Sequence, residues 1–211
     1  MTAQRRRQRS RGWAGPDQPT PGSAADETPE ADPESVAKGI VLRRLTAAPR
    51  SRSELAADLA ARDVPDDVAT KVLDRFTEVG LVDDQAYAQM LVRTRRDSRG
   101  LARRALQQEL RRKGVGDEEA AAALESVTAD DEVATAEALV AKRLPSTRGL
   151  PYETRVRRLA GMLARKGYNS GLAHRVVRDA ITAEGRDLRS TSNDSDLHVD
   201  SILDGGTDPS V

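Results

Sequence analysis

One short phrase of sequence occurs three times in this chain, about fifty residues apart. It reads SELAADLAARDV at residues 53–64, RRALQQELRRKGV at residues 103–115 and RRLAGMLARKGY at residues 157–168. When Leu59, Leu110 and Leu163 are aligned, a second leucine lies four residues earlier in every copy. Self-similarity at a fixed period of this length is typical of a tandem helical array. The repeat therefore constrains the fold more than any other feature of the chain.

Each copy has the pattern of a helix that ends in a left-handed turn. In the central copy Gly114 follows a basic segment, and glycine adopts a positive φ without steric cost. If Gly114 is the first residue beyond the helix cap, Val115 lies against Leu110, which is the hydrophobic contact of a Schellman motif. The first copy has Asp63 in place of glycine, and aspartate tolerates this conformation better than most residues. Each copy is therefore predicted to be a short helix with its own stop signal.

Two further helices flank each copy. Apolar residues at helical spacing precede the phrase at residues 36–45, 83–96 and 130–144, and follow it after Pro65, Asp117 and Asn169. The pairs Ser51–Glu54 and Thr128–Asp131 have the spacing of capping boxes, which mark where helices begin. The unit is thus a helix, a loop, a helix, a turn and a helix, and we expect the last helix to stop at Gly185.

The predicted fold is all-α, with three tandem three-helix repeats that form an elongated, curved array. The hydrophobic fraction is only 37% and the aromatic fraction 2%, so the core must be small and aliphatic. The two ends are rich in polar and charged residues, which indicates disorder. The predicted parts are a disordered tail (1–34), repeats 1, 2 and 3 (35–82, 83–128 and 129–185), and a disordered acidic tail (186–211).

Nothing in the sequence points to catalysis, a metal or a cofactor. The chain has no cysteine, and its two histidines, His174 and His198, are isolated from each other. The acidic pairs stand where helices begin, so the helix dipole accounts for them; they are residues 66–67, 83–84 and 130–131. No apolar run approaches the roughly 20 residues of a membrane span. We expect no catalytic residue, metal site, cofactor or membrane contact, and a cytoplasmic location.

The best candidate for a binding site is a dense basic stretch in the central unit. Two acidic residues, Asp97 and Glu109, accompany nine basic ones, although the formal net charge of the whole chain is zero. The nine are Arg93, Arg95, Arg96, Arg99, Arg103, Arg104, Arg111, Arg112 and Lys113. This density favours contact with DNA phosphates or an acidic protein surface over an ordinary solvated helix face. The stretch has no aromatic residue on which a base could stack, so we do not expect it to recognise individual bases.

The segment GLVDDQAYAQMLVRTRRDSRGLARRALQQELRRKGV, residues 80–115, resembles the signature region of the RecX family of bacterial regulators. The matching features are Asp83–Asp84 followed by Tyr87, the arginine-rich helix end, Gly100, and the helix that closes on Lys-Gly-Val. The resemblance covers residues 36–183. It is looser in the third unit, which carries the insert PSTRGLPYETR at residues 145–155.

This resemblance implies a non-enzymatic protein that binds the filament of the RecA recombinase on DNA. Such a protein would restrain the ATPase, strand-exchange and coprotease activities of RecA, in recombination and in the SOS response. It would act as a monomer and touch DNA phosphates without sequence preference. The alternative is a helix-turn-helix transcriptional regulator, because three-helix units with a basic helix can bind DNA. The segment EEAAAALESV, in a third helix, has few side chains that could read base edges.

Overall fold

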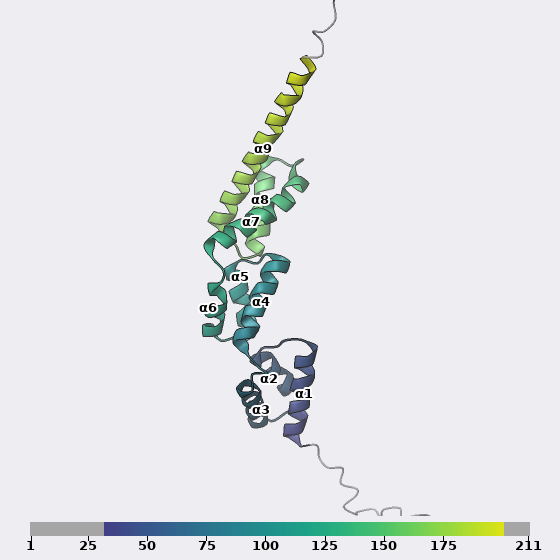
Figure 1. Cartoon of the computed structure of the whole chain (residues 1–211), viewed down its shortest axis with the longest axis vertical. Coiled ribbons are helices and arrows are strands. Elements are labelled where there is room, and N and C mark those ends of the chain that lie inside the picture. Colours follow the sequence, from purple (N-terminus) through teal and green to yellow (C-terminus); the bar gives the residue numbers. More distant parts are fainter. Residues whose placement is uncertain (1–31, 201–211) are drawn as a thin grey trace, which may run out of the picture.

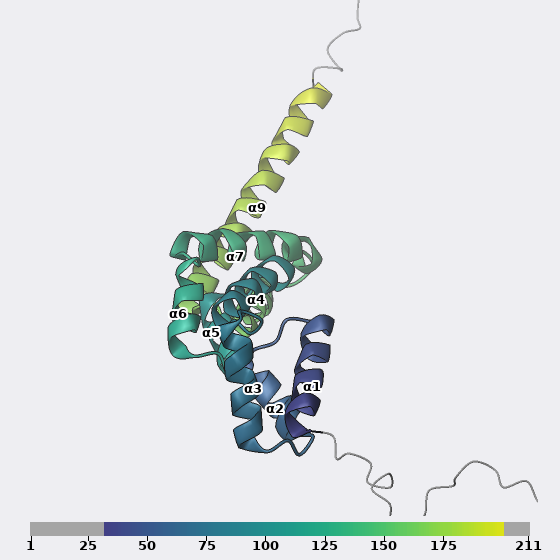
Figure 2. The ribbon, with the colours of Figure 1, turned by 60° about the horizontal axis from the view of Figure 1, so that its bottom comes forward.

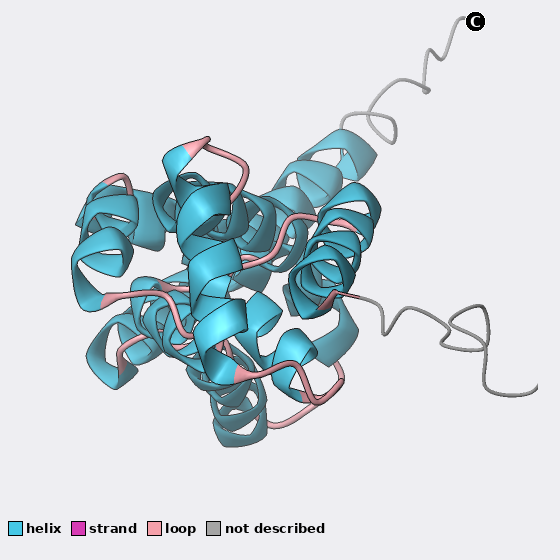
Figure 3. Cartoon of the chain, turned by 90° about the horizontal axis from the view of Figure 1, so that it is seen from below, coloured by secondary structure: helices cyan, strands magenta, loops and turns pink. Residues whose placement is uncertain are grey.

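The structure is a computed structural model that describes residues 32–200, with side chains described as far as Asp187. Within this range the chain forms nine α-helices and no strand, arranged as three stacked units along one axis (Figures 1 and 3). Unit 1 contains α1 (Pro33–Ala47), α2 (Arg52–Ala60) and α3 (Asp66–Glu78), and unit 2 contains α4 (Asp84–Arg99), α5 (Arg103–Arg112) and α6 (Asp117–Glu125). Unit 3 contains α7 (Ala129–Arg143), the 3₁₀ turn η1 (Leu144–Thr147), α8 (Tyr152–Arg165) and α9 (Ser170–Asp200). The predicted all-α array of three-helix units is confirmed. Of the two tails predicted at residues 1–34 and 186–211, residues 1–31 and 201–211 lie outside the described residues, and α1 already begins at Pro33.

The predicted ends of the three helices that carry the repeated phrase are also confirmed. At the end of α5, the Val115 N–H donates to the Leu110 carbonyl at 3.2 Å and the Gly114 N–H donates to the Arg111 carbonyl at 3.0 Å. This is the Schellman pattern, and α2 and α8 end with the same pair of bonds. Asp63 has a φ of 57° and is the one residue other than glycine with positive φ in the described range. Both predicted capping boxes are present, at Ser51 and Thr128.

Each unit buries its own small apolar cluster. The two leucines of each repeated phrase lie at the centres of these clusters and have almost no exposed surface; they are Leu55 and Leu59, Leu106 and Leu110, and Leu159 and Leu163. Their spacing of four residues places both on one face of a helix, which explains why the phrase recurs. Because each core is small, the array depends on stacking between neighbouring units.

The middle helices of the three units meet end to end. The Ser51 hydroxyl at the start of α2 donates to the Lys113 carbonyl at the end of α5, at 2.5 Å. One unit further on, the Ala102 N–H at the start of α5 donates to the Lys166 carbonyl at the end of α8, at 3.0 Å. The negative end of each helix dipole therefore faces the positive end of the next, which is a favourable arrangement.

This end-to-end contact explains why two copies of the phrase carry glycine. A Cβ on Gly167 would lie 2.7 Å from both the backbone nitrogen and the Cβ of Ala105, and a Cβ on Gly114 would overlap Ser53. Both glycines also have positive φ. Asp63 occupies the equivalent turn of unit 1, where it is exposed and no unit of the described chain packs against it. The crowding at the junctions, in addition to the left-handed backbone, therefore requires glycine.

The last helix differs from the prediction. We expected it to stop at Gly185 and a disordered tail to begin at residue 186, but α9 continues to Asp200 and projects beyond unit 3 (Figure 2). Gly185 lacks the positive φ of a helix stop. A single glycine in a helix interior costs about 1 kcal/mol relative to alanine, which is too little to end a helix by itself.

Candidate interaction surface

The nine basic residues predicted as a site divide into two groups, because several of them hold the fold together. Arg95 donates from Nε to Glu109 Oε1 at 2.6 Å, and Glu109 is buried. This ion pair joins α4 to α5, and the equivalent residues of unit 1, Arg44 and Asp58, form the same pair at 2.8 Å. A residue whose charge is neutralised inside a unit is poorly placed to bind a partner, so Arg95 is a structural residue.

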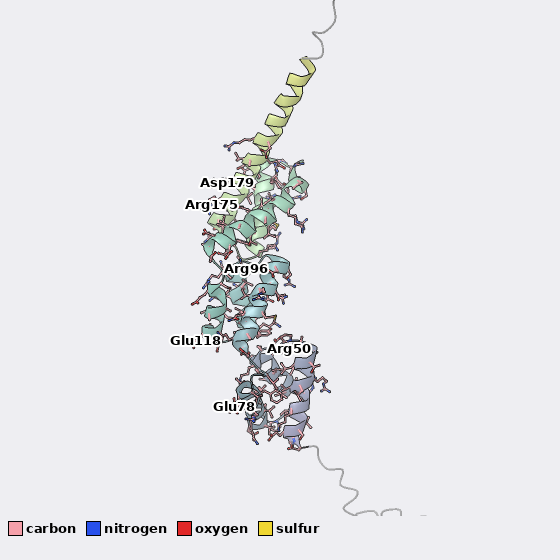
Figure 4. The ribbon with its side chains drawn as sticks, viewed as in Figure 1. Arg50, Glu78, Arg96, Glu118, Arg175 and Asp179 are labelled. Atoms are coloured by element: carbon pink, nitrogen blue, oxygen red, sulfur yellow. The ribbon has the colours of Figure 1, made fainter. Side chains whose placement is uncertain are left out.

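Three more of the predicted residues make contacts between helices. Arg96 lies 3.6 Å from Asp131 and donates to the Ser126 carbonyl at 3.5 Å, which connects α4 to the start of α7 (Figure 4). Arg103 donates from Nη1 to the Leu124 carbonyl at the end of α6. Lys113 lies 2.7 Å from Glu54 of unit 1. These contacts within the fold account for the three basic residues, so no binding partner is needed to explain them.

Glu54 is the centre of the contact between units 1 and 2. In addition to Lys113, it accepts from the Tyr87 hydroxyl at 3.0 Å and from the Ser51 N–H at 3.3 Å. Burial raises the pKa of Glu54, but the hydrogen bonds from Lys113, Ser51 and Tyr87 outweigh it, so the pKa is lowered overall. Burial and the bond to Glu54 raise the pKa of Tyr87 to about 12. Glu54 is therefore ionised at neutral pH and links the two units electrostatically.

The contact between units 2 and 3 includes a buried tyrosine. Tyr168 is buried, and its hydroxyl donates to the Gly100 carbonyl at 3.1 Å. Burial is the main reason that the pKa of Tyr168 is raised to about 12. Lys166 donates to the Arg99 carbonyl at the end of α4.

Replacing Tyr168 by phenylalanine tests the contact between Tyr168 and Gly100. The variant leaves the Gly100 carbonyl without its buried donor, so the free energy of unfolding should fall by about 1 kcal/mol. Chemical denaturation followed by circular dichroism measures this change. The matched control is Tyr152→Phe, because Tyr152 is 47% exposed and its replacement should change stability by less than about 0.5 kcal/mol. Equal effects of the two variants would contradict the assignment.

The other predicted residues are exposed. Arg93 and Arg99 lie on α4, and Arg104 and Arg112 lie on α5; none of these four forms an ion pair with a carboxylate in the part of the chain that the structure describes. Arg111 is also exposed, and its Nε lies 3.6 Å from Asp117, itself 86% exposed. An exposed pair of this kind contributes little to stability. The structure thus leaves five of the nine residues available to a partner, whereas the other four make contacts within the fold.

Two arginines of unit 3 belong with this exposed group but were missed. When Leu110 and Leu163 are aligned, Arg157 corresponds to Arg104 and Arg165 to Arg112. Both are exposed residues of α8. The alignment of the repeats contains the correspondence between these arginines. The density of basic residues, in contrast, indicates the central unit alone.

The described residues contain no group of three or more histidine, cysteine, aspartate or glutamate side chains that could hold a metal ion. None of the helices, as far as they are described, is both long enough and apolar enough to cross a bilayer.

Comparison with known proteins gives a consistent picture. Models of the first, second and third three-helix domains of RecX match residues 37–76, 83–124 and 130–177. The regulatory protein RecX of Thermobifida fusca is 52% identical over 171 residues, which cover 81% of this chain and 90% of that protein. The regulatory protein RecX of Streptomyces coelicolor is 51% identical over 159 residues, which cover 75% and 85% respectively.

Solved structures share the fold. A crystal structure of RecX from Lactobacillus salivarius superposes with a TM-score of 0.64 at 22% identity, covering 71% of this chain and 97% of that one. A second crystal structure of a regulatory protein RecX has a TM-score of 0.62 at 27% identity, with coverage of 71% and 73%. The three matching domain models and the high identity to curated relatives place this chain in the RecX family of regulatory proteins.

Proposed function

We propose that this protein is a non-enzymatic regulator that binds the RecA nucleoprotein filament and inhibits its ATPase, strand-exchange and coprotease activities. Membership of the RecX family supports a regulatory role. In this proposal the protein acts in the cytoplasm as a monomer, during recombination and the SOS response. It touches acidic protein surface and DNA phosphates without reading the base sequence.

The observation that carries the proposal is a pair of exposed arginines that recurs in two units. Arg104 and Arg112 of α5 correspond to Arg157 and Arg165 of α8, and all four lack a carboxylate partner among the described residues. A filament of identical subunits presents the same surface features at a regular interval. A regulator with repeated cationic positions can therefore contact several subunits at once through individually weak interactions.

The elongated shape also supports binding to a filament. Three stacked units supply length without a large core, and the column in Figure 1 is much longer than it is wide. A rod that contacts neighbouring recombinase subunits would hinder the subunit movements that accompany ATP hydrolysis. Inhibition then requires no chemistry on the regulator itself.

The helix-turn-helix alternative has less support. Two of the third helices begin with acidic residues, at Asp66 and Asp67 in α3 and at Asp117 in α6. These carboxylates would face the phosphates if such a helix entered the major groove by its N-terminus. A strong preference for one selected duplex over random duplex DNA would favour this alternative over ours.

The test is the ATPase activity of RecA on single-stranded DNA, measured while the protein is titrated. Replacing Arg104, Arg112, Arg157 and Arg165 together by alanine should raise the half-inhibitory concentration about tenfold or more, because four charge-assisted contacts are lost. The helicity of this variant should not change, since all four side chains are exposed.

A matched control removes the same charge from other exposed positions. Arg43, Arg75, Arg175 and Arg178 lie on α1, α3 and α9, and their replacement by alanine should change the half-inhibitory concentration less than about twofold. Undiminished inhibition by the first variant, or equal loss in both, would show that the repeated arginines are not the contact.

A further inference from the structure

A hollow of about 450 Å³ lies where unit 2 meets unit 3. The last turn of α4, the outer side of α7 and the end of α8 line it. Five cationic side chains and one carboxylate, that of Asp97, contribute to this lining. The cations are Arg96, Arg99, Lys142, Arg143 and Lys166. Figure 4 shows Arg96 at the end of unit 2 that faces unit 3.

The cations exceed what the fold itself requires. Each of them lies near the C-terminus of a helix, where a positive charge complements the helix dipole. Three helix ends carry together about −1.5 elementary charges, Asp97 adds one negative charge, and Asp131 lies 3.6 Å from Arg96. About one and a half positive charges therefore remain without compensation. Arg99, Lys142 and Arg143 are exposed and form no carboxylate ion pair within residues 32–187.

The remaining lining of the hollow is apolar. It includes Ala138 and Leu139 of α7 and Met162 of α8. Leu139 and Met162 are only partly covered by the core of unit 3, so an aliphatic side chain from outside could pack on them. No aromatic residue contributes to the hollow, whereas single-stranded nucleic acid is usually held by stacking on aromatic rings. An acidic peptide with one aliphatic residue suits these features better than a nucleotide does.

We propose that this hollow between units 2 and 3 docks an acidic linear segment of a partner protein, with one aliphatic side chain on Leu139 and Met162 and its carboxylates on Lys142, Arg143 and Arg99. The site is separate from the arginines repeated on α5 and α8. It would give the regulator a second point of attachment that recognises a peptide and does not depend on DNA.

The experiment measures fluorescence anisotropy of a fluorescein-labelled peptide made of four glutamates, one leucine and four glutamates, titrated with the full chain. We expect saturable binding. Lys142→Glu with Arg143→Glu should weaken it at least about tenfold, because two attractive contacts become repulsive. Arg104→Glu with Arg112→Glu makes the same change of charge on α5 and should alter binding less than about twofold.

Two further experiments test the apolar part of the lining. A peptide with serine in place of leucine should bind about tenfold more weakly, because it buries no aliphatic side chain. Ala138→Glu adds a carboxylate at an exposed helical position and should weaken the leucine peptide while leaving the helicity unchanged.

Three results would overturn the proposal. They are equal binding of the leucine and serine peptides, no saturable binding of either peptide, and preferential binding of a labelled oligothymidylate. In the third case, the variant Lys142→Glu with Arg143→Glu would abolish the binding of the oligothymidylate. The last result would assign the hollow to nucleic acid. The peptide assay contains no RecA, so a negative result in it would not contradict the proposed inhibition of the filament. Conversely, the ATPase test does not measure peptide binding.

Discussion

Replacing Gly167 by asparagine should lower the free energy of unfolding by about 2 kcal/mol. Asparagine tolerates positive φ better than most residues, so the backbone conformation at Gly167 contributes little to this cost. The loss comes mainly from crowding, because a Cβ at this position would lie 2.7 Å from the backbone nitrogen of Ala105 in the neighbouring unit. The measurement is chemical denaturation followed by circular dichroism.

The chain contains its own control for this prediction. Asp63 occupies the equivalent left-handed turn at the end of α2, with a φ of 57°, and is exposed. Asp63→Asn should therefore change stability by less than about 0.5 kcal/mol. Gly114→Asn should resemble Gly167→Asn, because Gly114 lies against Ser53 of unit 1. If all three variants behave alike, the glycines serve only the turn and the proposed role of the junctions is wrong.

Replacing Glu54 by glutamine should lower the free energy of unfolding at pH 7 by about 2 kcal/mol. The side chain of Glu54 is 17% exposed and has Lys113 at 2.7 Å. Glutamine has nearly the same shape but cannot neutralise this ammonium group. The matched control is Glu137→Gln, on the exposed side of α7, which should change stability by less than about 0.5 kcal/mol.

The effect of Glu54 should depend on pH in a defined direction. The folded-state pKa of Glu54 is lowered from 4.5, so its ionised form stabilises the folded protein. This contribution is complete at pH values above the unfolded-state pKa and is lost as the pH falls through the lower, folded-state value. The difference in stability between the wild type and Glu54→Gln should therefore shrink below pH 4.5. A difference that stays constant down to pH 2 would contradict the assignment of Glu54.

Much of the local structure could be predicted from the sequence. The end of α5 at Gly114 and the capping box at Ser51 involve residues three to five positions apart. Such signals act within one helical turn, so they can be recognised without knowledge of the fold. Gly185 shows the limit of this reasoning, because the residue type suggested a stop and α9 continues through it.

The candidate site was less predictable. The sequence showed a dense basic stretch, but it could not show which of its members face another helix. Arg95 and Arg104 are only nine positions apart in the sequence. The first nevertheless lies against Glu109 inside unit 2, whereas the second is exposed. Whether an arginine is neutralised depends on a partner from another helix, and charge density along the chain does not contain that information.

The sequence by itself determined the repeat, the helical class, the ends of α2, α5 and α8, and the membership of a family that the comparisons then confirmed. These properties follow from short-range periodicity and from the conformational preferences of single residues. Only the tertiary structure decided how the units join, as with Glu54 and Lys113, which are 59 residues apart. It also decided which arginines remain exposed and where α4, α7 and α8 enclose a basic hollow. Contacts of this kind depend on the relative placement of whole helices, which packing between units sets and local sequence does not.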